Sequence, residues 1–189
     1  MGLDMYLTAT RRVGDWQHSK ADERALYKTI MGAIGKPDWR MEDSPHAYVK
    51  VCVAYWRKAN QVHAFFVENC QQGNDERQTS EVSREQLQTL IDTAKTVLKA
   101  SDLVEGEIVE SYRTNAKCEM IPNMVAGKVI RDASCAKALL PAREGFFFGS
   151  YEYDEYYIAD LKDTVSMLEK ALTAFPEKEG WDFEYYGSW

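Results

Sequence analysis

The sequence lacks the short motifs by which many enzymes are identified. It contains no Gly-x-Ser-x-Gly nucleophile elbow, no His-Glu-x-x-His zinc motif, no phosphate loop ending in Gly-Lys-Ser/Thr and no Gly-x-Gly-x-x-Gly dinucleotide fingerprint. Gly145 and Gly149 enclose three phenylalanines, so this stretch cannot present exposed backbone amides to a phosphate as a glycine-rich loop does. No motif therefore points to a reaction.

Metal-ligating and redox residues are few and scattered. The three histidines do not cluster, and the four cysteines form no Cys-x-x-Cys pair, which argues against a zinc site or a thioredoxin-like redox pair. The cysteines are Cys52, Cys70, Cys118 and Cys135. We expect neither metal nor cofactor.

Long apolar runs and signal segments are missing as well. Nowhere do about 18 apolar residues follow one another, and the N-terminus has no charged segment followed by an apolar one. We therefore expect a cytoplasmic protein with reduced thiols that does not act at a membrane.

Basic residues are outnumbered by acidic ones. The chain of 189 residues has 23 Lys and Arg against 30 Asp and Glu, a net charge of −7. Duplex nucleic acid is disfavoured as a partner, because affinity for it depends on a basic face that neutralises phosphates. A local basic pocket remains compatible with this balance, since net charge does not describe one cleft.

Both ends of the chain have the pattern of strands. Residues 1–9 alternate apolar and polar side chains, residues 48–56 are rich in β-branched and aromatic residues, and residues 181–189 alternate rings with acids. Residues 103–130 contain two strand-like stretches separated by turn residues, which favours a β-hairpin or a projecting insertion.

Helices are predicted between these strands. Ser19 with Asp22, and Ser83 with Gln86, resemble capping boxes before apolar residues at helical spacing, and Asp154 suits the N-cap of a last helix. A further helix is expected to begin at Arg57 and to end near Cys70. With 45% hydrophobic residues the chain can bury a core.

We therefore predict one α+β domain over residues 1–189. Its mixed or antiparallel sheet includes both terminal strands and packs against three to four helices, with a β-hairpin-like insertion around residues 103–130.

The candidate site is the block from Tyr55 to Phe66, which combines rings, two cations, an amide and an imidazole. Rings offer stacking area, cations attract phosphate or carboxylate, and amides and imidazoles select hydrogen-bonding partners. A second aromatic concentration, Gly145 to Tyr157, is expected to form the opposite wall. The predicted ligand-binding residues are Tyr55, Trp56, Arg57, Lys58, Asn60, His63, Phe148 and Tyr153.

A structural interpretation of the same residues stays open. Trp56 also suits a core anchor, and Asn60 and His63 suit buried groups that satisfy the backbone. The run Phe146 to Phe148 is typical of a buried strand with alternate rings on opposite faces. The tyrosines between Tyr151 and Tyr157 fit either a cap and core or the rim of an interface.

Several motifs together resemble a family of uncharacterised bacteriophage and prophage proteins. They are the opening Met1-Gly-Leu-Asp-Met-Tyr-Leu, the stretch Tyr55-Trp-Arg-Lys-Ala-Asn60 with His63, the stretch Gly145-Phe-Phe-Phe-Gly-Ser150 with Tyr153-Asp-Glu-Tyr156, and the final Ser188-Trp189. The resemblance spans nearly the whole chain, except residues 103–130. It implies a compact accessory protein of phage or prophage context and transfers no activity.

Three functions are compatible with these observations. The first is a binding protein that sequesters a small anionic, nucleotide-type host signal in counter-defence. The second is a protein-interaction module that inhibits a host factor through the tyrosine-rich segment and residues 103–130. The third is a small hydrolase that uses His63 with an acidic partner, Asp154 or Glu155.

Overall fold

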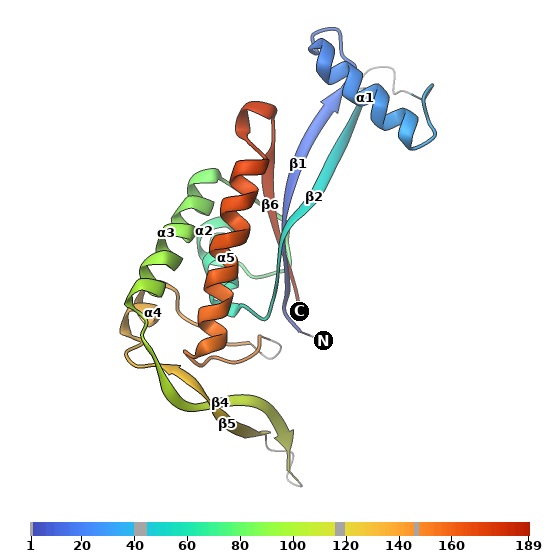
Figure 1. Ribbon diagram of the computed structural model, residues 1–189. Coiled ribbons are helices and arrows are strands. Elements are labelled where there is room, and N and C mark those ends of the chain that lie inside the picture. Colours follow the sequence, from blue (N-terminus) through green and yellow to red (C-terminus); the bar gives the residue numbers. More distant parts are fainter. Residues whose placement is uncertain (1, 40–44, 116–119, 146–147) are drawn as a thin grey trace.

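The two ends of the chain lie side by side in one antiparallel sheet (Figure 1). The computed structural model describes residues 2–39, 45–115, 120–145 and 148–189. The main sheet has the order β2-β1-β6-β3, and its strands are β1 (Asp4–Gly14), β2 (His46–Arg57), β3 (Ser80–Val82) and β6 (Asp182–Ser188). The predicted α+β domain, with strands from both ends in one sheet, is confirmed.

Three helices cover one face of this sheet (Figure 1). They are α2 (Asn60–Cys70), α3 (Arg84–Ala100) and α5 (Glu155–Ala174). The alternation in β1 turns Met5, Leu7 and Ala9 toward these helices, where all three are fully buried in one core. The structure also contains a short helix, α4 (Ser134–Leu139), and a single 3-10 turn, η1 (Glu177–Glu179).

Two of the predicted helix starts are confirmed. The Ser83 hydroxyl accepts a hydrogen bond from the Gln86 amide, and the Gln86 side chain accepts one from the Ser83 amide, so the capping box opens α3. The Asp154 carboxylate caps α5 by accepting from the amides of Tyr156 and Tyr157.

The predicted capping box at Ser19 is wrong. Helix α1 (Ala21–Ala33) begins after Lys20, which stands at the N-cap without a side-chain hydrogen bond. The amide of Ser19 instead donates to the carbonyl of Trp16, so Ser19 belongs to the preceding turn. α1 lies at the far end of the β1–β2 ribbon, away from the other helices (Figure 1).

The predicted helix start at Arg57 is also wrong. β2 continues to Arg57, which pairs with Asp4 of β1, and the chain then turns at Lys58 with a left-handed φ of 63°. The Lys58 amide donates to the Leu3 carbonyl at 2.7 Å, and α2 begins only at Asn60. Arg57 and Lys58 therefore lie at the end of a strand rather than on a helical face.

The insertion around residues 103–130 is a separate two-stranded hairpin, as predicted. It consists of β4 (Leu103–Thr114) and β5 (Met120–Ile130) and projects from the end of the molecule opposite α1 (Figure 1). The start of α5 fixes its base, because the amide of Ile130 donates to the Tyr153 carbonyl at 2.9 Å and the amide of Lys128 to the Glu155 carboxylate at 3.1 Å.

Phe148 does not continue a strand. It lies in a bend, where its amide donates to the Gly145 carbonyl, and its ring is buried against His63 and Trp189. The prediction of a buried strand is therefore wrong for Phe148, although burial of this ring agrees with the structure. The predicted strand positions 146–147 lie outside the described residues.

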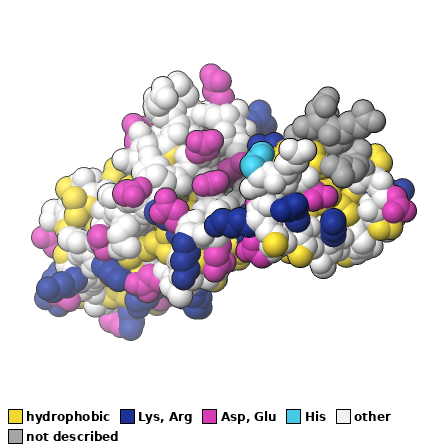
Figure 2. All heavy atoms as spheres, turned by 90° about the horizontal axis from the view of Figure 1, so that it is seen from above, with side chains coloured by type: hydrophobic (Ala, Val, Ile, Leu, Met, Phe, Trp, Pro, Cys, Tyr) yellow, Lys and Arg dark blue, Asp and Glu magenta, His cyan; other side chains and the backbone are white. Residues whose placement is uncertain are grey.

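The outer surface carries both signs of charge. In the view from the α1 end, acidic and basic side chains are intermingled over the face that is seen (Figure 2). Within the described ranges, no helix combines the length and the apolar character needed to cross a membrane.

Candidate functional site

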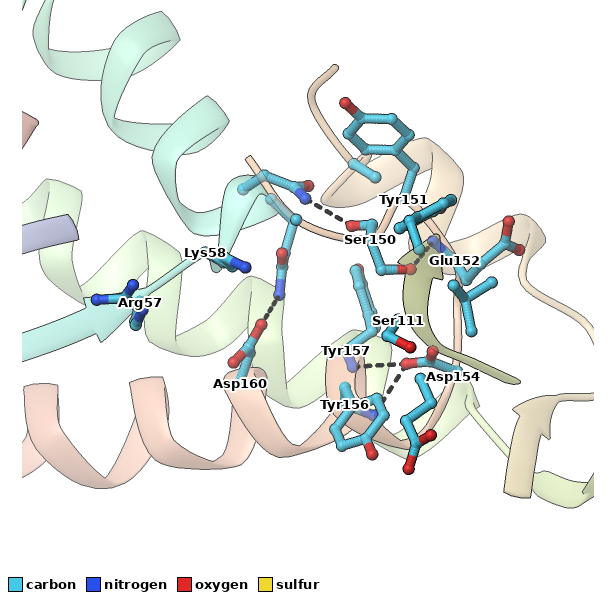
Figure 3. A pocket seen from close by; sticks show the side chains of 17 residues that line it. Arg57, Lys58, Ser111, Ser150, Tyr151, Glu152, Asp154, Tyr156, Tyr157 and Asp160 are labelled. Atoms are coloured by element: carbon cyan, nitrogen blue, oxygen red, sulfur yellow. Dashed lines mark hydrogen bonds between the residues drawn. The ribbon is translucent and has the colours of Figure 1, made fainter. Parts of the chain in front are cut away.

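A cavity of about 810 Å³ lies where four segments meet: the end of β2 with the start of α2, the loop 149–152, the start of α5, and the hairpin strand β4 (Figure 3). We call it the cleft. Its volume falls in the range of about 300–1,000 Å³ that is usual for small-molecule sites. The hairpin supplies one wall of the cleft, Val109 to Tyr112.

Two cations lie at one end of the cleft, to the left in Figure 3. Arg57 makes an exposed ion pair with Asp4 at 3.2 Å, whereas Lys58 forms no ion pair with any described residue. The Lys58 stem packs on Gly149, where an added Cβ would meet the Lys58 Cβ at 2.9 Å and φ is 89°. Glycine at position 149 thus allows the lysine stem to lie close to the loop.

Two buried amides form the floor. Asn60 donates to the carbonyls of Phe148 at 3.0 Å and Ser150 at 2.7 Å, and its own carbonyl accepts from the Arg143 amide at 3.0 Å. Asn60 therefore holds the loop 149–152 in place and has little capacity left for a ligand. Gln61 is also buried and donates to the Asp160 carboxylate at 3.1 Å.

Acidic groups lie at both ends of the cleft: Asp160 lies close to Lys58, and Glu152 and Asp154 lie toward the other end (Figure 3). Burial raises the pKa of Asp160 to about 6, although the hydrogen bond from Gln61 favours its charged form. Burial also raises the pKa of Asp154, against the hydrogen bonds from the amides of Tyr157 and Tyr156. The cations thus share the Arg57 end of the cleft with Asp160, and the carboxylates of Glu152 and Asp154 lie at the other end (Figure 3).

Tyrosines supply the aromatic surface. Tyr112, Tyr151 and Tyr156 line the cleft and are exposed, whereas Tyr157 is buried and donates to the Leu140 carbonyl at 2.9 Å. An exposed phenol ring offers a face for a planar group and a hydroxyl for a polar one. The aromatic rings that a ligand in the cleft could contact are therefore those of Tyr112, Tyr151 and Tyr156, which form its rim.

His63 belongs to a separate buried cluster. Its Nδ1 lies 2.7 Å from the Tyr185 hydroxyl and its Nε2 3.0 Å from the Asp75 carboxylate, which lies 3.3 Å from the Arg143 guanidinium. Because a carboxylate only accepts, the Nε2–H donates to Asp75 and Nδ1 accepts from Tyr185. The expected pairing with Asp154 or Glu155 is wrong: those carboxylates bond to the backbone at the start of α5 and at Lys128.

This cluster is built for stability rather than for reaction. His63 is 0% exposed, and burial lowers its pKa in spite of the nearby Asp75. Tyr185 is equally buried, and desolvation raises the pKa of its phenol, which disfavours the phenolate that a nucleophile would need. The side chains of Phe148 and Trp189 cover the imidazole.

Three of the predicted residues meet at the cleft: Arg57, Lys58 and Asn60. The indole of Trp56 is 3% exposed and donates to the Thr164 hydroxyl at 2.9 Å within the core. Tyr55 lies on the opposite face of the sheet, where its hydroxyl donates to Asp4. The remaining three are structural: His63 and Phe148 pack together, and the Tyr153 hydroxyl accepts from the Ala142 amide at 3.0 Å.

Sequence reasoning missed several residues of the cleft. Gln61 directly follows Asn60, which the composition of the block had indicated. Asp160 lies on the helix that Asp154 was predicted to cap. No sequence pattern indicated Ser111 and Tyr112, because the local sequence of a hairpin does not show which part of the protein the hairpin will contact.

Comparison with protein-family models, curated proteins and solved structures finds no match for this chain. A function is therefore inferred from the chemistry of the cleft alone. Among the described residues, no three His, Cys, Asp or Glu side chains are grouped so as to hold a metal ion.

The half-buried carboxyl group of Asp160 makes the stability of the protein depend on pH. Because its folded pKa is raised from 3.8 to about 6, its favourable contribution is complete below about pH 4 and is lost as pH rises through 6. We expect Asp160→Asn to match the wild type near pH 4 and to be more stable at pH 7.5, by on the order of 1 kcal/mol. Urea unfolding at both pH values measures this, with the exposed Asp92→Asn on α3 as the control.

Proposed function

We propose that the protein binds and sequesters a small anionic molecule of nucleotide type in the cleft. One observation supports this most directly: in a chain of net charge −7, Lys58 and Arg57 lie together at one end of a hollow rimmed by exposed tyrosines. The cations suit a phosphate, and a tyrosine face suits a planar base. Opposite them, the carboxylates of Glu152 and Asp154 would repel a second anionic group and so favour one orientation of the ligand (Figure 3).

Sequestration is favoured over turnover by the position of the only described histidine near the site. His63 is sealed in the core and hydrogen-bonded on both ring nitrogens, so it has no access to a bound molecule. Within the cleft, Asp154 and Asp160 each bond to groups of the protein itself. Binding needs only the charges and rings that line the cleft.

The resemblance to phage and prophage proteins gives this binding a context. A phage accessory protein that removes a nucleotide-type signal from the host cytoplasm would act as a sponge in counter-defence. The ligand would then be released intact when the protein unfolds.

Heat release tests this proposal. Purified protein is incubated with nucleoside monophosphates and cyclic nucleotides, washed, and heated, and the released molecules are separated by chromatography. We expect one class of nucleotide to be retained and recovered unchanged, and to raise the melting temperature by mass action. Recovery of an altered nucleotide would instead indicate an enzyme. Release of no nucleotide from the heated protein would contradict the proposal.

The alternative of a protein-interaction module has one structural observation in its favour. The projecting hairpin exposes Tyr112 and Met124, two residue types that are enriched at protein interfaces. If this function were the right one, a single host protein would co-purify, and it would remain bound after the charges of Arg57 and Lys58 were removed.

A further inference from the structure

A carboxylate shares the cationic end of the cleft. Asp160 of α5 lies close to Lys58 (Figure 3), and together with Arg57 it also lines a second, smaller hollow of about 410 Å³ between β2 and α5. The Asp160 side chain is half-buried and faces the cleft, so a molecule bound there can approach it. Its Oδ2 accepts from the Gln61 amide at 3.1 Å, and this hydrogen bond holds the carboxylate in place.

The cations do not neutralise this carboxylate in ion pairs. Arg57 pairs with Asp4, and neither Lys58 nor Asp160 forms an ion pair with any described residue. The Arg57 end therefore carries two positive charges, Arg57 and Lys58, and two negative ones, Asp4 and Asp160, before a ligand enters. An anion bound at the cations would lie within the field of the Asp160 charge and be repelled by it.

The rest of the cleft adds only negative charge. Besides Arg57, Lys58 and Asp160, the charged residues that line it are Glu110, Glu152 and Asp154. A first negative charge on the ligand gains the attraction of both cations, whereas a second charge on the same group gains less, because the nearby cations are then already compensated. The site is thus matched to a group with a single negative charge.

The two common phosphate groups of nucleotides differ in this respect. A phosphomonoester carries about −1.5 to −2 charges at pH 7, because its second pKa is about 6. A phosphodiester carries one negative charge and takes up no proton near neutral pH. A second phosphodiester at the other end of the cleft would meet Glu152 and Asp154, so the charges favour a ligand with one such group.

Building on the proposed function, we propose that Asp160 makes the cleft selective for a singly charged phosphodiester, so that its ligand is a cyclic mononucleotide rather than a nucleoside 5′-monophosphate. Arg57 and Lys58 attract the phosphate, and Asp160 discriminates against the second charge of the monoester. Asp160 is thereby a specificity-determining residue of the site.

Titration calorimetry at about pH 8 tests this selection with the 3′,5′-cyclic monophosphates and the 5′-monophosphates of guanosine, adenosine, cytidine and uridine. For the base that binds most tightly, wild-type protein is expected to bind the cyclic form about tenfold or more tightly than the 5′-monophosphate. Asp160→Asn keeps an oxygen that can accept from Gln61 and removes the charge. It should bind the 5′-monophosphate about tenfold more tightly than the wild type does and lose most of the preference.

The pH dependence gives a second readout that needs no variant. The charged groups near Asp160 are Arg57 and Lys58 at the end of β2, Asp154, Asp163 and Lys170 of α5, and Glu110 in the hairpin wall. Burial, with smaller contributions from Asp163 and Asp154, raises the pKa of Asp160 to about 6. At about pH 5 both Asp160 and the monoester are mostly protonated, so the two nucleotides should bind with similar affinity. A preference caused by the shape of the cyclic form would instead persist at this pH.

The outcomes separate this inference from the proposed function. Asp92→Asn removes an exposed carboxylate from α3 and should leave the preference as in the wild type, while circular dichroism and the melting temperature verify folding of both variants. Equal affinity or a preference for the 5′-monophosphate in wild-type protein at pH 8, or a preference unchanged in Asp160→Asn or at pH 5, would overturn the role of Asp160 while the sponge stands. Binding of neither form of any base, with no nucleotide released on heating, would overturn both.

Discussion

Replacing Trp56 by alanine is expected to lower the free energy of unfolding by about 3–5 kcal/mol, the range for removal of a buried aromatic side chain. The indole is 3% exposed, packs on the Phe66 ring at a centroid distance of 5.9 Å, and donates to the Thr164 hydroxyl of α5 at 2.9 Å. Its loss would leave a cavity between the sheet and α5. Urea unfolding followed by circular dichroism measures the change.

Its neighbour Tyr55 provides the matched control. Tyr55 points to the other face of the sheet and is 44% exposed, so Tyr55→Ala is expected to cost no more than about 1 kcal/mol, although it removes the contact with Tyr6. Trp56→Phe keeps much of the ring and loses one hydrogen bond, for an intermediate effect of about 1–2 kcal/mol. If Trp56→Ala left stability unchanged and abolished nucleotide binding, the indole would belong to a site and not to the core.

The contrast between Trp56 and Tyr55 shows why the boundary of α2 was misplaced from sequence. Trp56, Asn60, His63 and Val67 fit helical spacing, and Ala54, Trp56 and their neighbours fit strand alternation equally well. What decides between them is the ladder with β1, where Asp4 pairs with Arg57 and Met5 with Trp56. A partner strand some 50 residues away in sequence is not visible in a local pattern.

Local signals were sufficient where the deciding contacts are local. The capping box at Ser83 and the cap at Asp154 join residues two or three positions apart, and both helices begin as predicted. The alternation in β1 and in residues 182–188 reflects one buried face, which any sheet in this position must have. The hairpin could also be predicted from local signals, because its two strands are adjacent in the chain.

The cleft could be predicted only in part, because its walls come from separate parts of the chain. Arg57 and Lys58 were found from composition, whereas the hairpin wall depends on how the hairpin lies relative to α5. Asp75 was missed as the partner of His63 for a related reason. It lies only twelve residues further on, but it reaches the imidazole through a turn in which Gln72 has a left-handed φ of 56°.

Removing both charges at the Arg57 end is expected to weaken nucleotide binding about 100-fold or more. Each cation that meets a phosphate contributes on the order of 1.5–3 kcal/mol, and about 1.4 kcal/mol corresponds to a factor of ten in affinity. The variant Arg57→Gln/Lys58→Gln keeps Cβ, Cγ and Cδ of both side chains, which include the Lys58 atoms that lie nearest to Gly149. Stability should change little, because the ion pair from Arg57 to Asp4 is exposed.

Calorimetry with the tightest-binding monophosphate of guanosine, adenosine, cytidine and uridine measures this loss at two salt concentrations. Wild-type affinity should fall as salt rises, because exposed charges are screened, and the double variant should show a much weaker dependence. Lys28→Gln removes one charge from α1, at the opposite end of the molecule from the hairpin, and should bind as the wild type does (Figure 1). Unchanged affinity in the double variant would place the anionic group elsewhere and remove the main support for the proposed sponge.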